Sequence, residues 1–375
     1  MIDVNAILVA SFIIGGLSAV LAAMIVVVDS VVNNYGEVKI DINNGKKELK
    51  VNGGAPLLTT LSEQGIFIPS ACGGRGSCGA CKVKVLSDIG PILPTEAPLL
   101  DEEEMKQNIR LSCQVKVKSD IAIEIPEELF SAKIFKGVVE KINDLTYDIK
   151  EVKIKLVEPN EIEFKAGQYM QLVIPPYEKI NEYTQRAYSI ASSPSQKDSI
   201  EFFIRLVPGG IATTYVHKYL KENDQMELVG PFGEFYMRDT DADMICVAGG
   251  SGLAPIKSIV ADMFEREITN RNVWLFFGAR SLKDLYYLDF FQDMEKKWDR
   301  FHFVPALSEP QPEDNWKGET GLITDVLGKY FKEKMDQNTQ KEGYLCGSPG
   351  MINACVKVMT ANGISEDKIY YDKFA

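Results

Sequence analysis

The sequence is poor in histidine and in clustered basic residues, and each shortage excludes a class of function. Only two histidines, His217 and His302, occur among the 375 residues, so a Ser-His-Asp hydrolase or a histidine-rich zinc site has too little material. The formal net charge is -12 and the isoelectric point is about 4.9. No stretch gathers the lysines and arginines that bind a phosphate backbone. We therefore expect no nucleic-acid partner.

Cysteine is also sparse and unevenly spaced, which argues against a secreted disulfide framework. The seven cysteines are an odd number, and three of them fall within residues 71–82. Such clustering is typical of free or metal-bound thiols in a reducing compartment. With 45% hydrophobic content, the chain is long enough for two or three domains of ordinary size.

Charge is absent from Val4 to Val28, where the sequence reads VNAILVASFIIGGLSAVLAAMIVVV. At about 1.5 Å rise per residue, a helix of this length exceeds the roughly 30 Å hydrocarbon core of a bilayer. A signal peptide is the alternative, but no Lys or Arg precedes the run, which is longer than a usual signal core. The first basic residues, beginning with Lys39, follow it. We predict one transmembrane helix over residues 4–28, with the N-terminus outside and the following domains in the cytoplasm.

Hydrophobic periodicity predicts three folded domains after this span. Residues 36–127 alternate polar and apolar positions around turns and include one short helix, which indicates a small α+β domain. The segments EVKIDI and KELKVN, on either side of NNGK, predict a hairpin whose turn needs positive φ at Asn and Gly. Residues 131–238 contain short alternating segments separated by turn residues, which is typical of a closed antiparallel β-barrel. Residues 241–375 repeat an apolar strand, a glycine turn and a helix three times, which predicts an α/β domain with a parallel sheet.

Four cysteines, Cys72, Cys78, Cys81 and Cys113, have the spacing C-x5-C-x2-C-x31-C. The plant-type pattern for a 2Fe-2S cluster also takes three ligands from one loop and the fourth from a distant strand, and it differs by one residue in the first gap. Four glycines within residues 73–79 allow the backbone to close around a cluster and to aim N–H groups at its sulfurs. The alternatives are structural zinc, which usually presents two separated pairs of ligands, and inert cysteines. We expect Cys113 to lie on a strand of its own.

The segment RAYSIAS falls on a predicted strand of the barrel. Alternation places Arg186 and Tyr188 on one face, where the guanidinium could meet a diphosphate while the phenol ring lies on a flat cofactor. Ser189 would point to the other face. Further along, PGGIATTY opens a helix with Gly210 and Thr213. This indicates an anion site at a helix N-terminus, although a helix cap by Thr213 would look the same.

A glycine turn follows the first apolar strand of the last domain, in the segment VAGGSGLAP. Its residues Gly250, Gly252 and Pro255 resemble a dinucleotide fingerprint in which proline replaces the third glycine. Two more segments end later strands, at the edge where an open parallel sheet binds its ligand. They are GARS, with Gly278 and Arg280, and CGSPGM, with Cys346, Gly347 and Met351. A small buried residue is the alternative reading of Cys346.

The order of these segments, with ALSEPQPEDNWKGETGLI and a final YYDKFA, closely resembles the F subunits of sodium-translocating NADH:quinone oxidoreductases over essentially the whole chain. The flavin and nicotinamide halves are also similar to the wider ferredoxin-NADP reductase superfamily, which includes reductase components of oxygenases. The resemblance implies a β-grasp ferredoxin domain with a 2Fe-2S cluster, a barrel that binds FAD and a sheet domain that binds NADH. It also implies a cell inner membrane location, integral membrane partner subunits and, through them, a quinone.

The resemblance further implies roles for individual residues. The residues expected at the FAD are Arg186, Tyr188, Ser189, Thr213 near the diphosphate, and Phe374 against the flavin face. The residues expected at the NADH are Gly250, Gly252, Gly278 and Cys346. Ser189 would bond near the flavin nitrogen that receives the hydride, and Cys346 would position the nicotinamide. The alternative functions are a reductase component serving an oxygenase or another stand-alone acceptor, and a non-catalytic metal-binding module.

Overall fold

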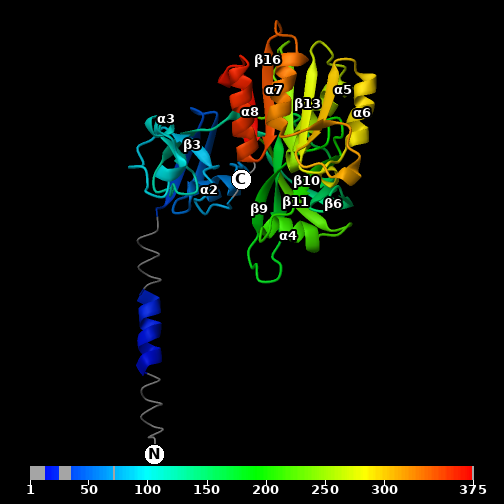
Figure 1. Ribbon diagram of the computed structural model, residues 1–375. Coiled ribbons are helices and arrows are strands. Elements are labelled where there is room, and N and C mark those ends of the chain that lie inside the picture. Colours follow the sequence, from blue (N-terminus) through cyan, green and yellow to red (C-terminus); the bar gives the residue numbers. More distant parts are fainter. Residues whose placement is uncertain (1–12, 25–34, 71, 374–375) are drawn as a thin grey trace, which may run out of the picture. The chain divides into compact units, whose positions relative to one another are not determined.

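The computed structural model describes residues 13–24, 35–70 and 72–373, and the chain divides into two compact units, residues 1–130 and 131–375 (Figure 1). Residues 13–24 form a helix whose side chains are all exposed, apolar ones included. Within the described ranges, no helix has the length and apolar character needed to cross a membrane. The span predicted over residues 4–28 extends past this helix at both ends, and those ends lie outside the described residues.

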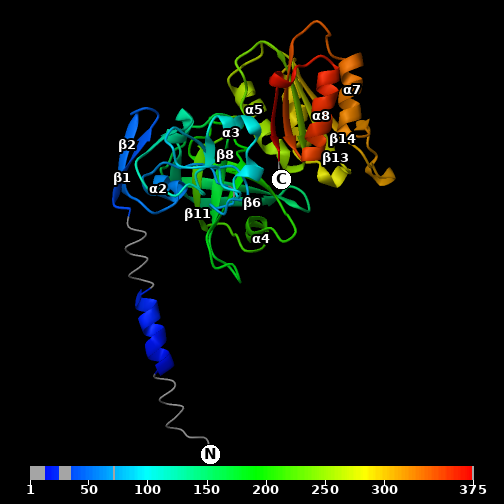
Figure 2. The ribbon, with the colours of Figure 1, turned by 90° about the vertical axis from the view of Figure 1, so that its left-hand side faces the viewer.

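The first unit contains a five-stranded sheet. Its elements are β1 (Glu37–Ile42), β2 (Lys47–Asn52), α2 (Leu57–Glu63), β3 (Lys82–Val85), α3 (Glu102–Lys106), β4 (Ile109–Leu111) and β5 (Ile121–Glu124). The strand order is β2-β1-β5-β3-β4. Strands β1 and β5 run parallel, and the other neighbours, such as β1 and β2 in Figure 2, are antiparallel. This is the β-grasp arrangement that the resemblance implied.

The side chains of β1 explain why this segment forms a half-buried strand. Val38, Ile40 and Ile42 are buried, and the residues between them are exposed or half-exposed, as a strand with one covered face requires. The short helix α2 buries Leu57 and Leu61. Each buried leucine contributes roughly 1.5–3 kcal/mol, so α2 adds to the core that covers one face of the sheet.

The second unit begins with an antiparallel barrel. Its elements are β6 (Lys133–Asp144), β7 (Ile149–Glu158), β8 (Tyr169–Ile174), β9 (Thr184–Ser189), β10 (Ser199–Arg205), α4 (Ile211–Lys218) and β11 (Gln225–Phe232). The strand order is β10-β7-β6-β11-β8-β9. A bridge between Ile190 and Phe202, both fully buried, joins the two edges of this sheet. The sheet therefore closes on itself, as the alternating segments predicted.

A parallel sheet completes the second unit. Its elements are β12 (Asp243–Gly249), η3 (Gly250–Gly252), α5 (Leu253–Glu265), β13 (Val273–Ala279), α6 (Leu288–Lys297), β14 (Phe301–Leu307), β15 (Glu319–Thr320), α7 (Ile323–Glu333), β16 (Lys341–Gly347), α8 (Pro349–Ala361) and β17 (Ile369–Lys373). The order is β15-β14-β13-β12-β16-β17, with every neighbour parallel. Helices α5 and α6 cover one face, and α7 and α8 cover the other (Figure 1).

The unit formed by β14 and α7 was not predicted. The sequence pattern indicated three strand-and-helix units, and the structure adds this fourth one. Pro305 lies inside β14, and residues 308–322 separate the strand from α7. Proline is disfavoured within strands, and a long connection obscures the repeat. The proline is tolerated because β15 pairs only with Ala306 and Leu307, so Pro305 has no partner residue on that side.

Helix α5 is bonded to the barrel through polar side chains. Lys257 Nζ donates to Ala191 O at 3.1 Å and pairs with Glu201 Oε2 at 3.0 Å. The next residue, Ser258, donates from Oγ to Ser192 O at 2.6 Å. Both α5 side chains are buried. These bonds contribute to holding barrel and parallel sheet together as one unit.

Candidate redox site

The four thiols predicted to hold a cluster form two pairs in the first unit. Cys72, Cys78 and Cys81 lie in the loop between α2 and β3. The Sγ atoms of Cys72 and Cys78 are 3.4 Å apart, and Cys81 hydrogen-bonds to Cys113. Cys81 and Cys113 are buried, whereas Cys78 is exposed. The fold therefore brings together thiols that are far apart in the sequence.

The prediction that Cys113 lies on a strand is wrong. Strand β4 ends at Leu111, and Cys113 lies in the turn that follows. The N–H groups of Gln114 and Val115 both bond to Leu111 O, at 2.8 and 3.2 Å. These short-range bonds replace the ladder bonds that a continuing strand would make. They turn the backbone at Cys113, the residue whose thiol meets Cys81.

Hydrogen bonds to the sulfurs favour the charged form of two thiols. Burial acts to raise the pKa of Cys72, but several hydrogen bonds, led by one from the Ser77 backbone, lower it to about 6. The hydrogen bond with Cys81 lowers the pKa of Cys113 to about 6 against the effect of burial. The same contact, with burial, raises the pKa of Cys81. A thiolate is the form that binds iron, so this environment suits a ligand set.

The donor set fits a two-iron cluster. Among the residues the structure describes, no group of three or more histidine, cysteine or acidic side chains is placed to hold one metal ion. A 2Fe-2S cluster instead needs four thiolates, two for each iron, which matches two pairs of thiols. The loop also requires glycine. At Gly76, where φ is +73°, an added Cβ would lie 2.6 Å from Gln114 Nε2.

Strand β9 carries the three residues predicted to contact a flavin. Tyr188 packs against the barrel core, and burial raises the pKa of its phenol well above the ordinary value. Arg186 Nη1 donates to Gln185 O at 2.7 Å. Ser189 is buried, and its Oγ donates to Asp372 Oδ2 at 3.4 Å. Burial of Tyr188 keeps its ring neutral.

Asp372 is a residue of this region that the sequence analysis missed. It lies on β17, 183 positions from Ser189 along the chain, so no local pattern links the two side chains. Burial raises the pKa of the Asp372 carboxyl, and the hydrogen bond from Ser189 opposes that shift. The only signal in the sequence was its place in the segment YYDKFA. Phe374, predicted from the same segment, lies outside the described residues.

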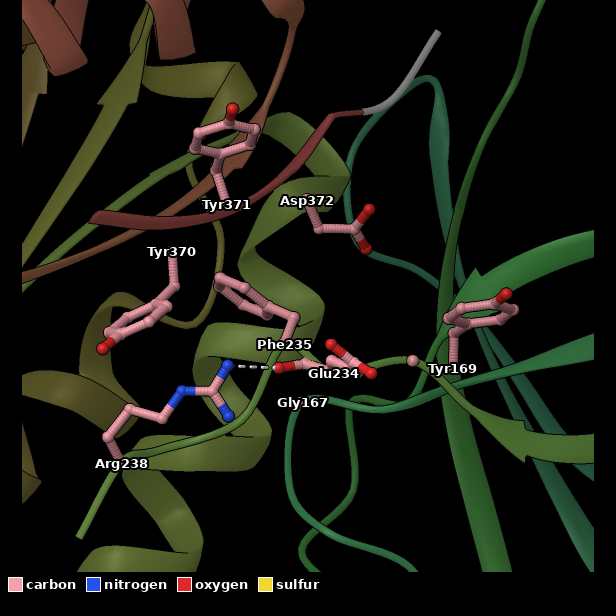
Figure 3. Close-up of a pocket in the computed structure, with 9 residues that line it drawn as sticks. Gly167, Tyr169, Glu234, Phe235, Arg238, Tyr370, Tyr371 and Asp372 are labelled. Carbon is pink, nitrogen blue, oxygen red and sulfur yellow. Dashed lines mark hydrogen bonds between the residues drawn. The ribbon is translucent and has the colours of Figure 1, made fainter. Parts of the chain in front are cut away.

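A pocket of about 270 Å³ has Asp372 in its wall (Figure 3). Its lining residues are Gly167, Tyr169, Gly233, Glu234, Phe235, Arg238, Tyr370, Tyr371 and Asp372. Tyr169 pairs with Ser189 in the β8–β9 ladder, so the pocket lies next to β9, the strand that carries the residues predicted to contact a flavin. The Arg238 guanidinium lies 4.5 Å from the Tyr370 ring centre. Aromatic rings with a few charged groups are typical linings for a flat, polar ligand.

Gly210 and Thr213 lie at the start of α4, as predicted. Gly210 is the N-cap and offers no side chain to the helix. The Thr213 hydroxyl accepts from Val207 N at 3.1 Å and bonds to the Gly210 carbonyl at 3.4 Å. Thr213 therefore ties the Pro-Gly-Gly loop to the helix, a local role close to the cap alternative. The first backbone N–H groups of a helix have no partner within the helix, so an anion site at the start of α4 stays a prediction.

The carboxyl ends of β12 and β16 form the topological switch point of the parallel sheet. From β12 the chain runs outward to β13, β14 and β15, then returns to place β16 on the other side of β12. Ligands bind at such a point in open α/β sheets. The predicted residues Gly250, Gly252, Cys346 and Gly347 all lie at these two strand ends. The fold thus brings both predicted glycine turns to one place.

Close backbone packing explains Gly252 and the environment of Cys346. A Cβ on Gly252 would lie 2.3 Å from Cys346 O and 2.8 Å from Gly347 N. Cys346 is fully buried, and burial raises the pKa of its thiol well above the ordinary value. The thiol is therefore neutral and is not a nucleophile at neutral pH. Pro255 is buried in the first turn of α5, where its fixed φ suits the helix.

Met351, Gly278 and Arg280 are the other residues predicted to contact the NADH. Added Cβ atoms at Gly249 and Gly347 would lie 2.8 Å from Met351 Sδ and 2.7 Å from Met351 Cε, so Met351 covers the glycine turn. An added Cβ on Gly278 would lie 2.8 Å from the Cβ of Ile323. Arg280 is exposed and pairs with Glu309 at 3.0 Å.

Arg205, at the end of β10, is a second residue that the sequence analysis missed. Its Nη1 lies 3.5 Å from the position of a Cβ on Gly250, and its Nε donates to Asp148 Oδ2 at 2.7 Å. A barrel strand therefore brings a cation to the glycine turn after β12. No pattern in the sequence connects the two segments, because the barrel and the sheet meet only in the folded unit.

These sites define a class of protein, a flavo-iron-sulfur reductase that takes electrons from a nicotinamide. Three family models match the chain in the same order. They are the 2Fe-2S iron-sulfur cluster binding domain over residues 40–118, the oxidoreductase FAD-binding domain over 136–236 and the oxidoreductase NAD-binding domain over 246–357. The predicted cofactors, a 2Fe-2S cluster, FAD and NADH, are confirmed at the level of these domains.

The chain belongs to the family of F subunits of Na⁺-translocating NADH-quinone reductases, which confirms the resemblance. The F subunit of the Neisseria meningitidis serogroup C enzyme is 37% identical over an alignment of 391 positions, and the alignment covers 95% of this chain and 96% of the relative. The F subunit of the Mannheimia succiniciproducens enzyme is 37% identical over 392 residues, with 95% of each chain covered. These alignments leave almost none of the chain outside the family.

Solved structures with the same three-domain extent are reductases. A cytochrome P450 reductase from Amycolatopsis is 28% identical, has a TM-score of 0.72, and matches over 90% of this chain and 98% of its own. A ferredoxin reductase in carbazole 1,9a-dioxygenase is 26% identical, with a TM-score of 0.67 and coverage of 91% and 99%. The fold is therefore shared with reductases that are named for a cytochrome P450 and for a dioxygenase.

Proposed function

We propose that this chain is the NADH-oxidising subunit of a sodium-pumping NADH:quinone reductase. The observation that carries the proposal is the 37% identity to a Neisseria F subunit over 95% of the chain, with all three cofactor domains in order. The protein takes a hydride from NADH and passes single electrons to other subunits, which reduce the quinone. When bound, FAD converts a two-electron donation into single electrons and the 2Fe-2S cluster relays them.

The residues of the flavin side bind and orient rather than react covalently. Arg186 on β9 is proposed to meet the diphosphate, and the start of α4 at Gly210 and Thr213 is proposed as a second anion site. Tyr188 offers a neutral ring for the flavin. Ser189 Oγ bonds to Asp372, which fixes the direction of the hydroxyl and can hold a proton at Oδ2. Phe374 is proposed to cover the flavin face.

The residues of the nicotinamide side shape a narrow crevice at the switch point. Gly250, Gly252 and Gly347 keep the strand ends free of side chains, and the residues before Pro255 in the first turn of α5 are proposed to supply N–H groups for the dinucleotide phosphates. Pro255 has no N–H, and its fixed φ suits the helical turn. Cys346 contributes a neutral thiol that positions the nicotinamide ring. Further proposed contacts are Gly278, Arg280, Met351 and, from the barrel, Arg205.

The cluster ligands are proposed to be the two thiol pairs, Cys72 with Cys78 and Cys81 with Cys113. We place the domain boundaries at residues 36–127, 131–238 and 241–375. Residues 4–28 are proposed to anchor the chain in the cell inner membrane as a single span, with the cofactor domains in the cytoplasm, which is supported by an uncharged run longer than a bilayer core.

Fractionation tests the membrane anchor. The full chain should stay with salt-washed membranes, and a chain lacking residues 1–30 should be soluble and still oxidise NADH with a dye as acceptor. A full chain that washes off with salt refutes the span.

A second function, a reductase component for an oxygenase or similar acceptor, is favoured by the two reductases that share the fold over nine tenths of the chain. Purification from native membranes in mild detergent separates the two. Co-purifying integral membrane subunits with NADH-dependent quinone reduction support the pump. Isolation of the chain alone, with rapid NADH-dependent reduction of a soluble oxygenase or ferredoxin and none of quinone, refutes it in favour of the reductase component.

A further inference from the structure

A buried ion pair anchors the segment that runs beside the cluster loop. Arg110 Nη2 lies 2.6 Å from Glu96 Oε2, and the two side chains are 2% and 0% exposed. Arg110 also donates to the carbonyls of Gly90 and Pro91, at 3.1 and 3.2 Å. Glu96 accepts from Leu111 N at 2.9 Å. Because every one of these groups is bonded, the segment around Glu96 is held firmly against the end of β4.

The residue next to Glu96 orients an amide that faces a cluster ligand. Thr95 Oγ1 donates to Gln114 Oε1 at 3.0 Å. With its oxygen occupied in this way, the Gln114 amide directs its nitrogen to Cys113 Sγ, at 3.5 Å. The nitrogen also fills the space that a Cβ on Gly76 would need. The Gln114 side chain therefore contacts Thr95, Cys113 and the backbone at Gly76.

We propose that Gln114 tunes the reduction potential of the cluster through its hydrogen bond to Cys113, and that Thr95 and the Glu96–Arg110 pair are its positioning residues. The inference deepens the proposed function, because it rests on Cys113 as a ligand. Reduction adds one electron to the cluster and increases the negative charge on its sulfurs. An N–H donor at a sulfur therefore stabilises the reduced form more than the oxidised form. No bond forms or breaks at Gln114, and no proton moves.

The size of the effect follows from the worth of one hydrogen bond. Removing a single partner changes an equilibrium by roughly three- to tenfold. Gln114→Leu should therefore lower the ratio of reduced to oxidised cluster at a fixed potential by about that factor. This corresponds to a reduction potential that is lower by about 30–60 mV, at the one-electron constant of 59 mV per tenfold. Gln114→Glu should shift it at least as far, since it replaces the donor with a negative charge.

Redox titration of the full-length holoprotein in detergent, monitored by the electron paramagnetic resonance of the reduced cluster, measures this ratio without NADH or partner subunits. Gln107→Leu is the matched control, because Gln107 is an exposed glutamine of the same unit bonded to Glu103. The control should titrate like the wild type. A Gln114→Leu protein that titrates with the control overturns the proposal.

Thr95→Val separates positioning from a general disturbance. It keeps Gln114 but frees the amide to rotate, so we expect a shift in the same direction as Gln114→Leu and smaller. In the Gln114→Leu background the same change should add nothing, because the donor it positions is gone. An equal shift in both backgrounds overturns the positioning role. If Gln114→Leu fails to hold a cluster, Thr95→Val decides alone, and an unchanged potential overturns the proposal. A wild-type chain without any cluster would refute the ligand assignment instead.

Discussion

Replacing Gly252 with alanine should destabilise the second unit for a purely steric reason. The backbone of Gly252 has φ −63° and ψ −7°, which alanine adopts readily. The added Cβ, however, would lie 2.3 Å from the carbonyl oxygen of Cys346 and 2.5 Å from its carbonyl carbon. These are backbone atoms of β16, a strand paired on both sides. Since ordinary Cβ contacts begin at 3.4 Å, the strand or the turn must move by about 1 Å.

Overpacking of this kind typically costs about 1–3 kcal/mol, and the upper half of that range applies because backbone rather than a flexible side chain stands in the way. Gly328→Ala is the matched control. Gly328 lies inside α7, and its added Cβ would meet only Val358 Cγ1, at 3.7 Å. Alanine favours a helix over glycine by about 1 kcal/mol. The two variants should therefore differ by about 3 kcal/mol.

The measurement is thermal unfolding of the full-length holoprotein, followed by release of flavin fluorescence. For a unit of this size, about 3 kcal/mol corresponds to roughly 6–12 °C between the two melting temperatures. NADH titration of the Gly252→Ala protein should also show a raised KM, because the same displacement opens the switch point. If Gly252→Ala melts together with Gly328→Ala or above it, the close approach of β16 to the glycine turn is refuted.

Three further changes test other parts of the molecule. Burial raises the pKa of Asp372, so the folded protein binds the carboxyl proton more tightly than the unfolded chain does. The folding stability that this proton contributes falls as pH rises from about 4 toward the raised pKa. The urea midpoint of Asp372→Asn should exceed that of the wild type at neutral pH and converge with it near pH 4; a difference independent of pH contradicts this. Cys113→Ser should lose iron and visible absorbance of the cluster, while Cys355→Ser, buried in the sheet domain, keeps both; full iron content in Cys113→Ser would remove it from the ligand set. Glu96→Gln leaves a buried guanidinium without its charged partner and should cost about 3–5 kcal/mol, whereas Glu48→Gln breaks an exposed pair and should leave the urea midpoint close to that of the wild type; equal urea midpoints for the first unit of these two variants would disprove the difference.

Local sequence patterns predicted the elements whose signal lies within a few residues. Strands β1 and β2 match the alternating segments EVKIDI and KELKVN residue for residue. The turn between them places Asn44 and Gly45 at positive φ, as the hairpin pattern requires. The cluster cysteines could be found because their spacing reflects one loop and one return of the chain. The hairpin depends on neighbouring residues alone, and the cluster set needs only one ligand from farther along the chain.

The remaining features depend on residues that meet only after folding. The turn at Cys113 is set by hydrogen bonds to Leu111 O, whereas the segment IRLSCQVKV reads as one continuous strand. Asp372 and Ser189 come from strands of different sheets, and Arg205 reaches the glycine turn from the barrel. Each of these features depends on tertiary structure, which local sequence patterns do not predict. Knowledge of the family locates the domains, whereas these contacts come from the folded chain.

The bonds from Lys257 and Ser258 to the barrel bear on how such proteins can be recombined. Two neighbouring side chains of α5 bond to carbonyls and a carboxylate of the barrel. A lineage that exchanged only its parallel-sheet half for that of a distant reductase would keep the carboxylate of Glu201 in the barrel without its buried cation, Lys257. Barrel and sheet should therefore pass between genes as one block. Gene fusion can add or remove modules at the outer ends of that block at far smaller cost.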